Sequence, residues 1–463
     1  MHLKGAFVPK IMIFHILIIS LLIVLIPNAN AQNKEEWIAI YNGPENSVDR
    51  GIDVAVGPSG NIYVTGWSWD ASTEYDFATA CYDPNGHMLW SARYNGPEND
   101  HDFPRSMVLD SNENVIVTGW SFGNGTDRDY ITIKYNKEGK ELWTTRYNGP
   151  GNKWDEANDV VCDLNGNIFV TGHSCGKNGV EFTTIAYDVY GNELWIARME
   201  DKDYTSSEGK ALDIGPSGNI YVTGYGPGID PYWPSIDYLT VAYNADGKEL
   251  WIARYNGPEG FIDEAYDIVV DQSENVYVTG QSQGDGWGYD FATVAYDSKG
   301  TELWVARYTD MGNSCQEAKA IALDSQGNIY VTGHSLVINS SSMSTRHDYA
   351  TVKYNQNGDL LWVAIFNGPR NGGDHPYDLV IDDLGNVYVT GRIYSNETSW
   401  DSATVAYDID GNELWRSVYN SPDNSSEVSY AIDIDSKGNV YVIGDCNGDL
   451  ETSTNFLLIK YPP

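Results

Sequence analysis

One short motif constrains the fold of this chain more than any other feature. The segment GNIYVTG, at residues 60–66, recurs eight times with small changes, and the last copy ends in VIG. The valines of these endings are Val64, Val117, Val170, Val222, Val278, Val331, Val389 and Val442. A tryptophan precedes each valine by 27 residues, from Trp37 to Trp415. A fixed period of this kind indicates a repeated structural unit.

A second fixed distance shows where the repeat varies. A tyrosine such as Tyr82 lies eight residues before the next tryptophan, here Trp90, in every unit that another tryptophan follows. The distance from valine to tyrosine, in contrast, runs from 17 to 23 residues. All length variation therefore falls in one segment of the unit.

Each unit has the pattern of four short strands. The stretch AYDIVVDQSENVYVTG, at 265–280, contains two runs rich in Val, Ile and Tyr around a polar turn, and DFATVAYDSKGTELWVARY, at 290–308, contains two more. Asp, Asn and Gly occupy the turns, where side-chain hydrogen bonds or positive φ angles are needed. Repeated units of four antiparallel strands are typical of a β-propeller. The sequence predicts an all-β fold, an eight-bladed β-propeller of four-stranded antiparallel blades.

The two ends of the chain predict how the ring closes. The chain enters the repeat at the tryptophan strand and ends after the third strand of the last unit, NFLLIKY. We expect the N-terminal outer strand, 36–41, to complete the last blade by pairing with 455–461. Closure of this kind leaves no free sheet edge.

The repeat resembles a known family. The pattern DxxGNxYVTG…DxxTVAYDxxGxELWxARYNGP is similar to the SBBP β-propeller repeat of exported prokaryotic proteins, and the resemblance extends over 34–463. It implies the propeller fold and carries no catalytic motif that the residues of this chain match.

The first 31 residues have the features of an export signal. Lys4 and Lys10 precede the apolar run 11–26, and Ala29-Asn30-Ala31 gives the small-x-small pattern of a cleavage site. We expect residues 1–31 to be a signal peptide and 32–463 to be a single propeller domain that is extracellular, on the cell surface or periplasmic. An uncleaved membrane anchor is the alternative reading of the same run.

The net charge restricts the classes of partner. The chain carries a formal charge of −37, which repels nucleic-acid phosphates and anionic headgroups. We therefore expect a glycan or protein ligand, no nucleic acid, no membrane span in the mature chain, and a monomer.

The variable segment and the connections between units should lie on one face of the ring, where loops on a rigid scaffold carry function. Seven tryptophans that are not part of the repeat fall in these segments, and aromatic side chains suit sugar or peptide binding. The position after each VTG carries different side chains in different units. The ligand-binding candidates are Trp67, Trp69, Trp120, Trp154, His173, Tyr225, Trp233, Trp287, His334 and Trp400. Packing of these aromatic groups against one another is the alternative interpretation.

Acids and small residues alternate eleven residues before the valines, as in Asp53 and Ser106, and bases such as Arg105, Lys210 and Lys319 precede the small residues. We interpret these acids and bases as ion pairs between blades.

His334, His347 and His375 fall near one another in the predicted topology. They have no tight ligand motif, and we assign no metal ligand, cofactor or catalytic residue.

The sequence thus favours an exported, non-catalytic binding scaffold. A metal-assisted lyase or hydrolase with its site on the same face, and a structural protein of the cell envelope, are the alternatives.

Overall fold

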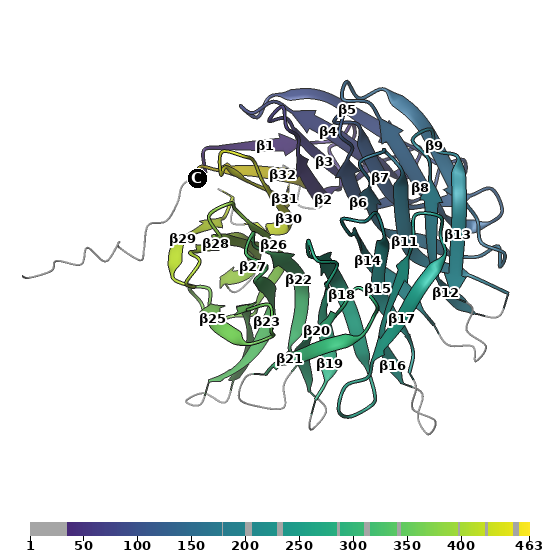
Figure 1. The fold of residues 1–463 in the computed structure, drawn as a ribbon. Coiled ribbons are helices and arrows are strands. Elements are labelled where there is room, and N and C mark those ends of the chain that lie inside the picture. The colour runs from purple at the N-terminus through teal and green to yellow at the C-terminus, as the bar shows by residue number, and fades with distance from the viewer. Residues whose placement is uncertain are drawn as a thin grey trace, which may run out of the picture.

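The computed structural model describes residues 35–177, 179–199, 206–228, 235–284, 288–309, 315–339, 344–396, 399–421, 425–447 and 453–463. Within these ranges the chain forms eight four-stranded antiparallel sheets, which stand as blades around a common centre (Figure 1). This confirms the predicted fold class. No helix in the described ranges has the length and apolar character that a membrane crossing requires.

The strands follow one another outward within each blade. Blade 1 contains β2 (Asp49–Val56), β3 (Ile62–Asp70), β4 (Glu74–Tyr82) and β5 (Met88–Tyr94). Blade 2 contains β6 (Asp102–Leu109), β7 (Val115–Gly123), β8 (Asp127–Tyr135) and β9 (Glu141–Tyr147). Blade 3 contains β10 (Asp155–Cys162), β11 (Ile168–Cys175), β12 (Val180–Tyr187) and β13 (Glu193–Met199). Blade 4 contains β14 (Glu208–Ile214), β15 (Ile220–Pro227), β16 (Ile236–Tyr243) and β17 (Glu249–Tyr255).

The second half of the ring repeats this order. Blade 5 contains β18 (Asp263–Val270), β19 (Val276–Gln283), β20 (Tyr289–Tyr296) and β21 (Glu302–Tyr308). Blade 6 contains β22 (Glu317–Leu323), β23 (Ile329–Asn339), β24 (Ser344–Tyr354) and β25 (Leu360–Phe366). Blade 7 contains β26 (Asp374–Ile381), β27 (Val387–Asn396), β28 (Ser399–Tyr407) and β29 (Glu413–Tyr419).

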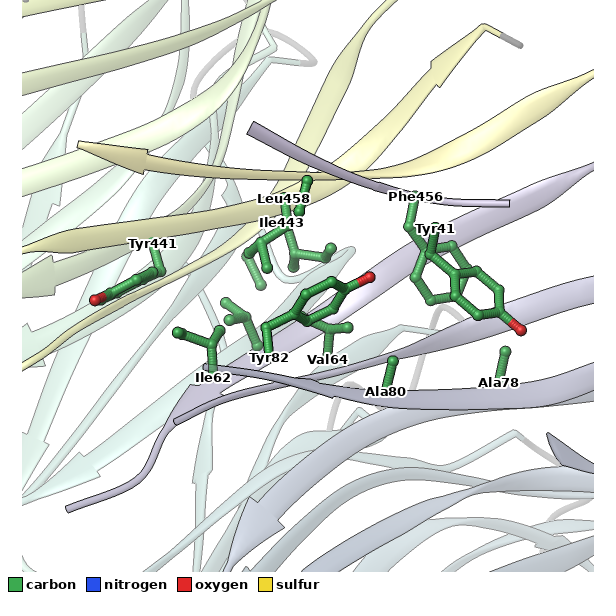
Figure 2. Close-up of a cluster of buried hydrophobic side chains, with 13 residues drawn as sticks. Tyr41, Ile62, Val64, Ala78, Ala80, Tyr82, Tyr441, Ile443, Phe456 and Leu458 are labelled. Atoms are coloured by element: carbon green, nitrogen blue, oxygen red, sulfur yellow. The ribbon is translucent and has the colours of Figure 1, made fainter. Parts of the chain in front are cut away.

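Blade 8 closes the ring from both ends of the chain. It consists of β30 (Val428–Ile434), β31 (Val440–Asn447), β32 (Thr454–Tyr461) and, as its outer strand, β1 (Trp37–Tyr41). Strand β1 pairs with β32 in antiparallel register from Trp37 opposite Lys460 to Tyr41 opposite Phe456. The predicted closure is therefore confirmed. The core between blades 8 and 1 joins residues from both termini, and the Tyr41 and Phe456 rings lie 4.8 Å apart (Figure 2).

Seven of the eight outer-strand tryptophans dock onto the third-to-fourth turn of the following blade; Trp415 instead contacts the Tyr461 ring, because no turn joins β32 to β1 in blade 8. The Trp251 indole N–H donates a hydrogen bond to the Ser298 carbonyl (3.1 Å), and the indole lies over Gly300. Gly300 has a φ of +79°, which glycine adopts without strain. A Cβ atom at Gly300 would lie 2.6 Å from Trp251 Cδ2. The same contact recurs for Trp37, Trp90, Trp143, Trp195, Trp304 and Trp362. The constant spacing of the repeat therefore serves docking between blades.

The inner strands are also linked, and here the predicted ion pairs are wrong. Asp53 Oδ2 accepts a hydrogen bond from the Met107 N–H of the next blade (2.7 Å). The same link joins Asp159 to Leu212, Asp213 to Val270, Asp267 to Ile321, Asp378 to Ile432 and Asp433 to Val56. The inner acids thus bind backbone N–H groups of the next blade.

A β-bulge explains why the bases do not reach these acids. In each first hairpin the register shifts by one residue, for example between Pro104 and Ser106, so Arg105 opposes no residue and its side chain is re-aimed. Arg105, Lys210 and Lys319 contact Glu156, Glu208 and Glu317 respectively.

The docking contact predicts different effects for two glycine substitutions. Gly300 and Gly218 both have a φ of +79°, and no atom lies within 4 Å of a Cβ built on Gly218. Gly218→Ala should lower the free energy of unfolding by about 1–2 kcal/mol, because an alanine is strained at positive φ. Gly300→Ala should lower it by at least about 1 kcal/mol more, because the methyl group also collides with Trp251. Urea denaturation measures both values, and equal losses would contradict the docking role.

The inner acids predict a pH dependence of stability. Burial raises the pKa of Asp378 to about 7, against the opposing effect of the Ile432 and Leu379 N–H groups, whereas the unfolded value is about 3.9. The folded state therefore favours the protonated carboxyl, and stability falls as the pH rises from about 4 to about 7. The free energy of unfolding of Asp378→Asn, relative to that of wild type, should therefore rise by about 1.4 kcal/mol for each pH unit in this window. Denaturation at pH 4.5 and 7.5 measures this difference.

An acid of opposite behaviour supplies the control for this experiment. At Asp435, burial acts to raise the pKa but is outweighed by hydrogen bonds from Asn439 and Lys437, so the pKa is lowered. The stability that Asp435 contributes changes only below about pH 4, where the unfolded carboxyl ionises, so the difference between Asp435→Asn and wild type should stay nearly constant between about pH 4.5 and 7.5. A constant difference between Asp378→Asn and wild type at both pH values would refute the assignment.

Candidate functional site

The two faces of the ring carry different connections. The turn face carries the short turns between first and second strands and between third and fourth strands, such as 57–60 and 83–86. The hairpin face carries the hairpins between second and third strands, such as 70–74, and the connections between blades. The variable segment of the repeat therefore lies on the hairpin face.

Three positions of the repeat meet on the hairpin face at each junction between blades. The first follows the glycine of the VTG motif, and the second lies diagonally across from it on the third strand, within side-chain reach. The third lies on the inner strand of the next blade. Between blades 6 and 7 these are His334, His347 and His375. We call each such group a junction triad.

The eight junction triads occupy equivalent places but differ in chemistry. In order around the ring they are Trp67/Tyr75/Phe103, Trp120/Arg128/Glu156, His173/Val180/Glu208, Tyr225/Ile236/Glu264, Gln281/Tyr289/Glu317, His334/His347/His375, Arg392/Trp400/Val428 and Asp445/Thr454/Arg50.

The first junction is an aromatic cluster. Phe103 lies between two of the predicted candidates, with ring centroids 4.9 Å from both Trp67 and Trp120. Trp120 is only 6% exposed, and the Arg50 guanidinium lies over Trp67 (5.4 Å). The two tryptophans are thus brought together, largely by packing against each other through Phe103. Sequence reasoning missed Phe103, although it lies at a constant position three residues before Ser106.

Three of the remaining predicted tryptophans, Trp69, Trp154 and Trp400, do not join this cluster. Trp69 donates a hydrogen bond from its indole N–H to Glu74 on the same hairpin (3.3 Å). Trp154, which is 47% exposed, lies edge-on to His173 (6.0 Å). Trp400 belongs to blade 7. Trp233 and Trp287 lie outside the described residues.

The interpretation of these tryptophans as loop residues is corrected for four of them. Trp67 and Trp69 lie within β3, Trp120 within β7 and Trp400 within β28. The physical reason is that the hairpin strands continue past the body of the blade and retain their ladder pairing, so positions expected in loops are held by the sheet.

Charged groups of opposite sign pair at the second and third junctions. Glu156 is 7% exposed and forms ion pairs with Arg128 and with Arg105 (3.4 Å). Glu208 lies 2.7 Å from Lys210 and 3.5 Å from His173 Nδ1. Burial acts to raise the pKa of Glu208, but His173 and Lys210 outweigh it and hold the pKa well below its usual range.

Tyr225 of the fourth junction reaches an acid of the third. The Tyr225 hydroxyl, another predicted candidate, donates to Glu208 Oε2 (2.6 Å). At the eighth junction Arg50 Nε lies 2.9 Å from Asp445 Oδ2. A base thus lies beside each of Glu156, Glu208, Glu317 and Asp445, in a chain whose net charge is −37.

The sixth junction is different, because its three members are all histidines. Their ring centroids lie 4.7 Å apart for His334 and His347, and 5.1 Å from each of these to His375. One nitrogen from each ring lies within 4.8 Å of the other two. The structure therefore brings these three residues together, as the predicted topology indicated, although the sequence analysis assigned none of them as a metal ligand.

Burial sets the protonation of these histidines. It lowers the pKa of His334 to about 2 and that of His375 to about 4, and positive or imidazole neighbours add to the effect. Burial also lowers the pKa of His347, against the effect of Glu317. At neutral pH the three rings are therefore uncharged, the form in which histidine donates a lone pair to a metal ion.

Arg392 stands beside this cluster without an acid. Its guanidinium lies over the Trp400 ring (4.3 Å) and the Tyr377 ring (5.8 Å), and Nε is buried without a hydrogen-bond partner. Arg392 forms no ion pair with any residue in the described ranges. It is a half-buried cation that a bound anionic group would satisfy.

The cavities on the turn face resemble one another, because similar turn residues line them. One of about 470 Å³ lies between two neighbouring turns and is lined by Asp382, Asn386, Asp435 and adjacent residues. The same Asp-x-x-Gly-Asn turn chemistry lines the next such cavity, through Asp324 and Gly327. These groups are already used to shape the turns, as when Asp435 Oδ1 accepts from the Asn439 N–H (2.9 Å).

Several known proteins are similar to this chain in sequence or in structure. An uncharacterized WD repeat-containing protein of Acanthamoeba polyphaga mimivirus is 22% identical over 433 residues; the match covers 67% of this chain and 30% of that protein. The chain therefore spans less than a third of that relative's length. Sqt1 from Chaetomium thermophilum is similar in structure, with a TM-score of 0.52, 9% identity, and coverage of 93% of this chain and 99% of Sqt1. A polysaccharide lyase, an ulvan lyase, gives a TM-score of 0.46 at 12% identity, covering 89% of this chain and 94% of the lyase.

The family comparison agrees with the repeat that the sequence shows. The SBBP family, described as a beta-propeller repeat, matches residues 250–286, 304–338 and 361–397. These segments carry the same motif as the other copies in the chain, and the structure gives every copy the same four-stranded blade. Three segments of the chain thus match the SBBP beta-propeller repeat, and the chain has the propeller fold.

Proposed function

We propose that this chain is an exported, non-catalytic binding scaffold that holds a protein ligand on the hairpin face. The observation that carries the proposal is the contrast between the two faces. Equivalent positions on the turn face repeat the same turn chemistry, whereas the junction triads carry aromatic, ionic and imidazole groups in equivalent places. A surface with different chemistry at each step around a ring can recognise an asymmetric partner.

The packing of the aromatic groups favours protein over glycan. Sugar stacking needs a free flat ring face, but Trp120 is nearly covered and Trp67 contacts Phe103 and Arg50. Half-buried Arg, Tyr and Trp side chains at the centre of a surface are the types that dominate protein interfaces. Arg392 supplies an unpaired cation for a carboxylate of the ligand.

Two photocrosslinking positions test which face binds. A photocrosslinking amino acid replaces either Trp154 on the hairpin face or Leu164, 95% exposed on the turn face. We expect a discrete conjugate from position 154 only, when the protein is incubated with the secreted and envelope fractions of its source cells. Conjugates from position 164 alone, or equally from both, would place the interaction elsewhere.

A variant of Arg392 tests the contact chemistry once the partner is captured. Arg392→Gln should weaken binding of that partner by about 10-fold or more, since hydrogen bonds to charged groups contribute about 1.5–3 kcal/mol. Arg254→Gln is the matched control, because Arg254 is exposed and donates only to the Pro227 carbonyl. Equal effects of the two variants would contradict the role of Arg392, and binding on a glycan array that Arg392→Gln abolishes would make the ligand a glycan.

Export is a separate part of the proposal and rests on the features of residues 1–31. Sequencing of the N-terminus of the protein from its native source should give Gln32 as the first residue. A protein that begins at Met1 or at one of the next few residues, and that is recovered in the membrane fraction, would instead support an uncleaved membrane anchor.

A further inference from the structure

We propose that His334, His347 and His375 form a binding site for one divalent transition-metal ion, with zinc as the ion that fits best. Imidazole nitrogens are preferred ligands of zinc and of neighbouring first-row ions. Three protein ligands with a fourth position left open to solvent are typical of reactive or ligand-binding zinc sites rather than of closed structural ones. The proposal is independent of the protein-binding role.

The geometry needs little adjustment to bind an ion. Tetrahedral coordination at about 2.0–2.1 Å places the nitrogens about 3.4 Å apart, and those of the three histidines already lie within 4.8 Å of one another. The rings come from three strands, β23, β24 and β26, whose backbones are fixed by ladder pairing. Small side-chain rotations therefore suffice, and the scaffold limits how far the rings can separate.

Comparison with the other junction triads shows why the histidine triad suits a cation. The aromatic triad is satisfied by ring contacts, and the second and eighth are satisfied by ion pairs. The histidine triad instead brings together three imidazole rings, each of which can donate a lone pair to a cation. His334 is 8% exposed, and its Nδ1 is buried with no hydrogen-bond partner. A metal ion would satisfy all three rings at once.

Two charged residues beside the histidines, Glu317 and Lys319, have opposite effects on the binding of a cation. Glu317 Oε2 lies 3.7 Å from His334 Nε2, so the carboxylate can orient the ring while Nδ1 faces the metal, as carboxylates behind histidine ligands do. Lys319 Nζ lies 2.5 Å from Glu317 Oε1 and opposes a divalent cation by repulsion. His347 and His375 are half-buried, which leaves a path for the ion and for a solvent or ligand oxygen at the fourth position.

Metal titration of the full chain tests the site directly. The protein is stripped with a chelator and titrated with Zn²⁺ against a chromophoric competitor, with excess Mg²⁺ to occupy acidic surface sites. Cys315→Ser is the background, because that thiol is exposed. We expect one site per chain, and a loss of affinity of at least about 100-fold in His347→Gln and in His375→Gln, since even removal of a group behind a ligand weakens binding about 10- to 100-fold. Co²⁺ at the same site should give the visible absorption of a tetrahedral ion.

Two further variants separate the proposal from general loss of structure. His173→Gln, at the equivalent position on β11 beside Glu208, should leave zinc binding unchanged. Lys319→Gln should raise the affinity several-fold, because it removes the repelling charge and frees Glu317, and a gain cannot arise from misfolding. The proposal is overturned if zinc does not bind with defined stoichiometry, or if His347→Gln and His375→Gln bind zinc as tightly as wild type does.

Discussion

The docking of an indole over a glycine turn is the contact on which this ring depends. Each outer-strand tryptophan from Trp37 to Trp362 reaches the third-to-fourth turn of the next blade, donates a hydrogen bond to a carbonyl and lies over a glycine. That contact fixes the distance between tryptophan, glycine and the buried strands. It explains why the repeat tolerates no change in spacing along most of its length, and why the turn face shows the same residues blade after blade.

Freedom of sequence remains where no docking contact is needed. The hairpin face lies beyond the inner hydrogen bonds from Asp53 and its equivalents, and its junction triads meet only after the blades have docked. A triad therefore combines residues from two blades, held by strands whose positions the core has already determined. Sites built on strands in this way are more rigid than sites on free loops, and each junction can change its chemistry without altering the fold.

Much of the architecture is evident from the sequence because it follows from spacing. The valine and tryptophan anchors predict the blades, and the phase of the repeat at the two ends predicts the pairing of β1 with β32. The ion pairs predicted for the inner strands are wrong, because a β-bulge turns Arg105 away from the inner acids and toward Glu156. The prediction assumed that side chains alternate strictly between the two sides of a strand, and this alternation does not show where a bulge interrupts it.

The candidate site was less accessible to sequence reasoning. The residues after the VTG motif were identified, and so was the proximity of His334, His347 and His375. Most other partners were not, because a triad joins positions on both sides of a hairpin of variable length and then crosses to the next blade. Phe103 and Glu317 lie at constant positions, yet nothing in the repeat alone indicates that they face a neighbour.

Docking of the blades brings together the side chains of each junction triad on the hairpin face, and in the histidine triad these side chains can bind a metal ion. X-ray diffraction from crystals grown with zinc, recorded on both sides of the zinc absorption edge, tests this binding most directly. We expect an anomalous peak between blades 6 and 7 from a zinc ion that is bound by one nitrogen of each of the three imidazoles. Zinc found only at acidic turns of the opposite face, with the three rings unmoved and unliganded, would contradict it.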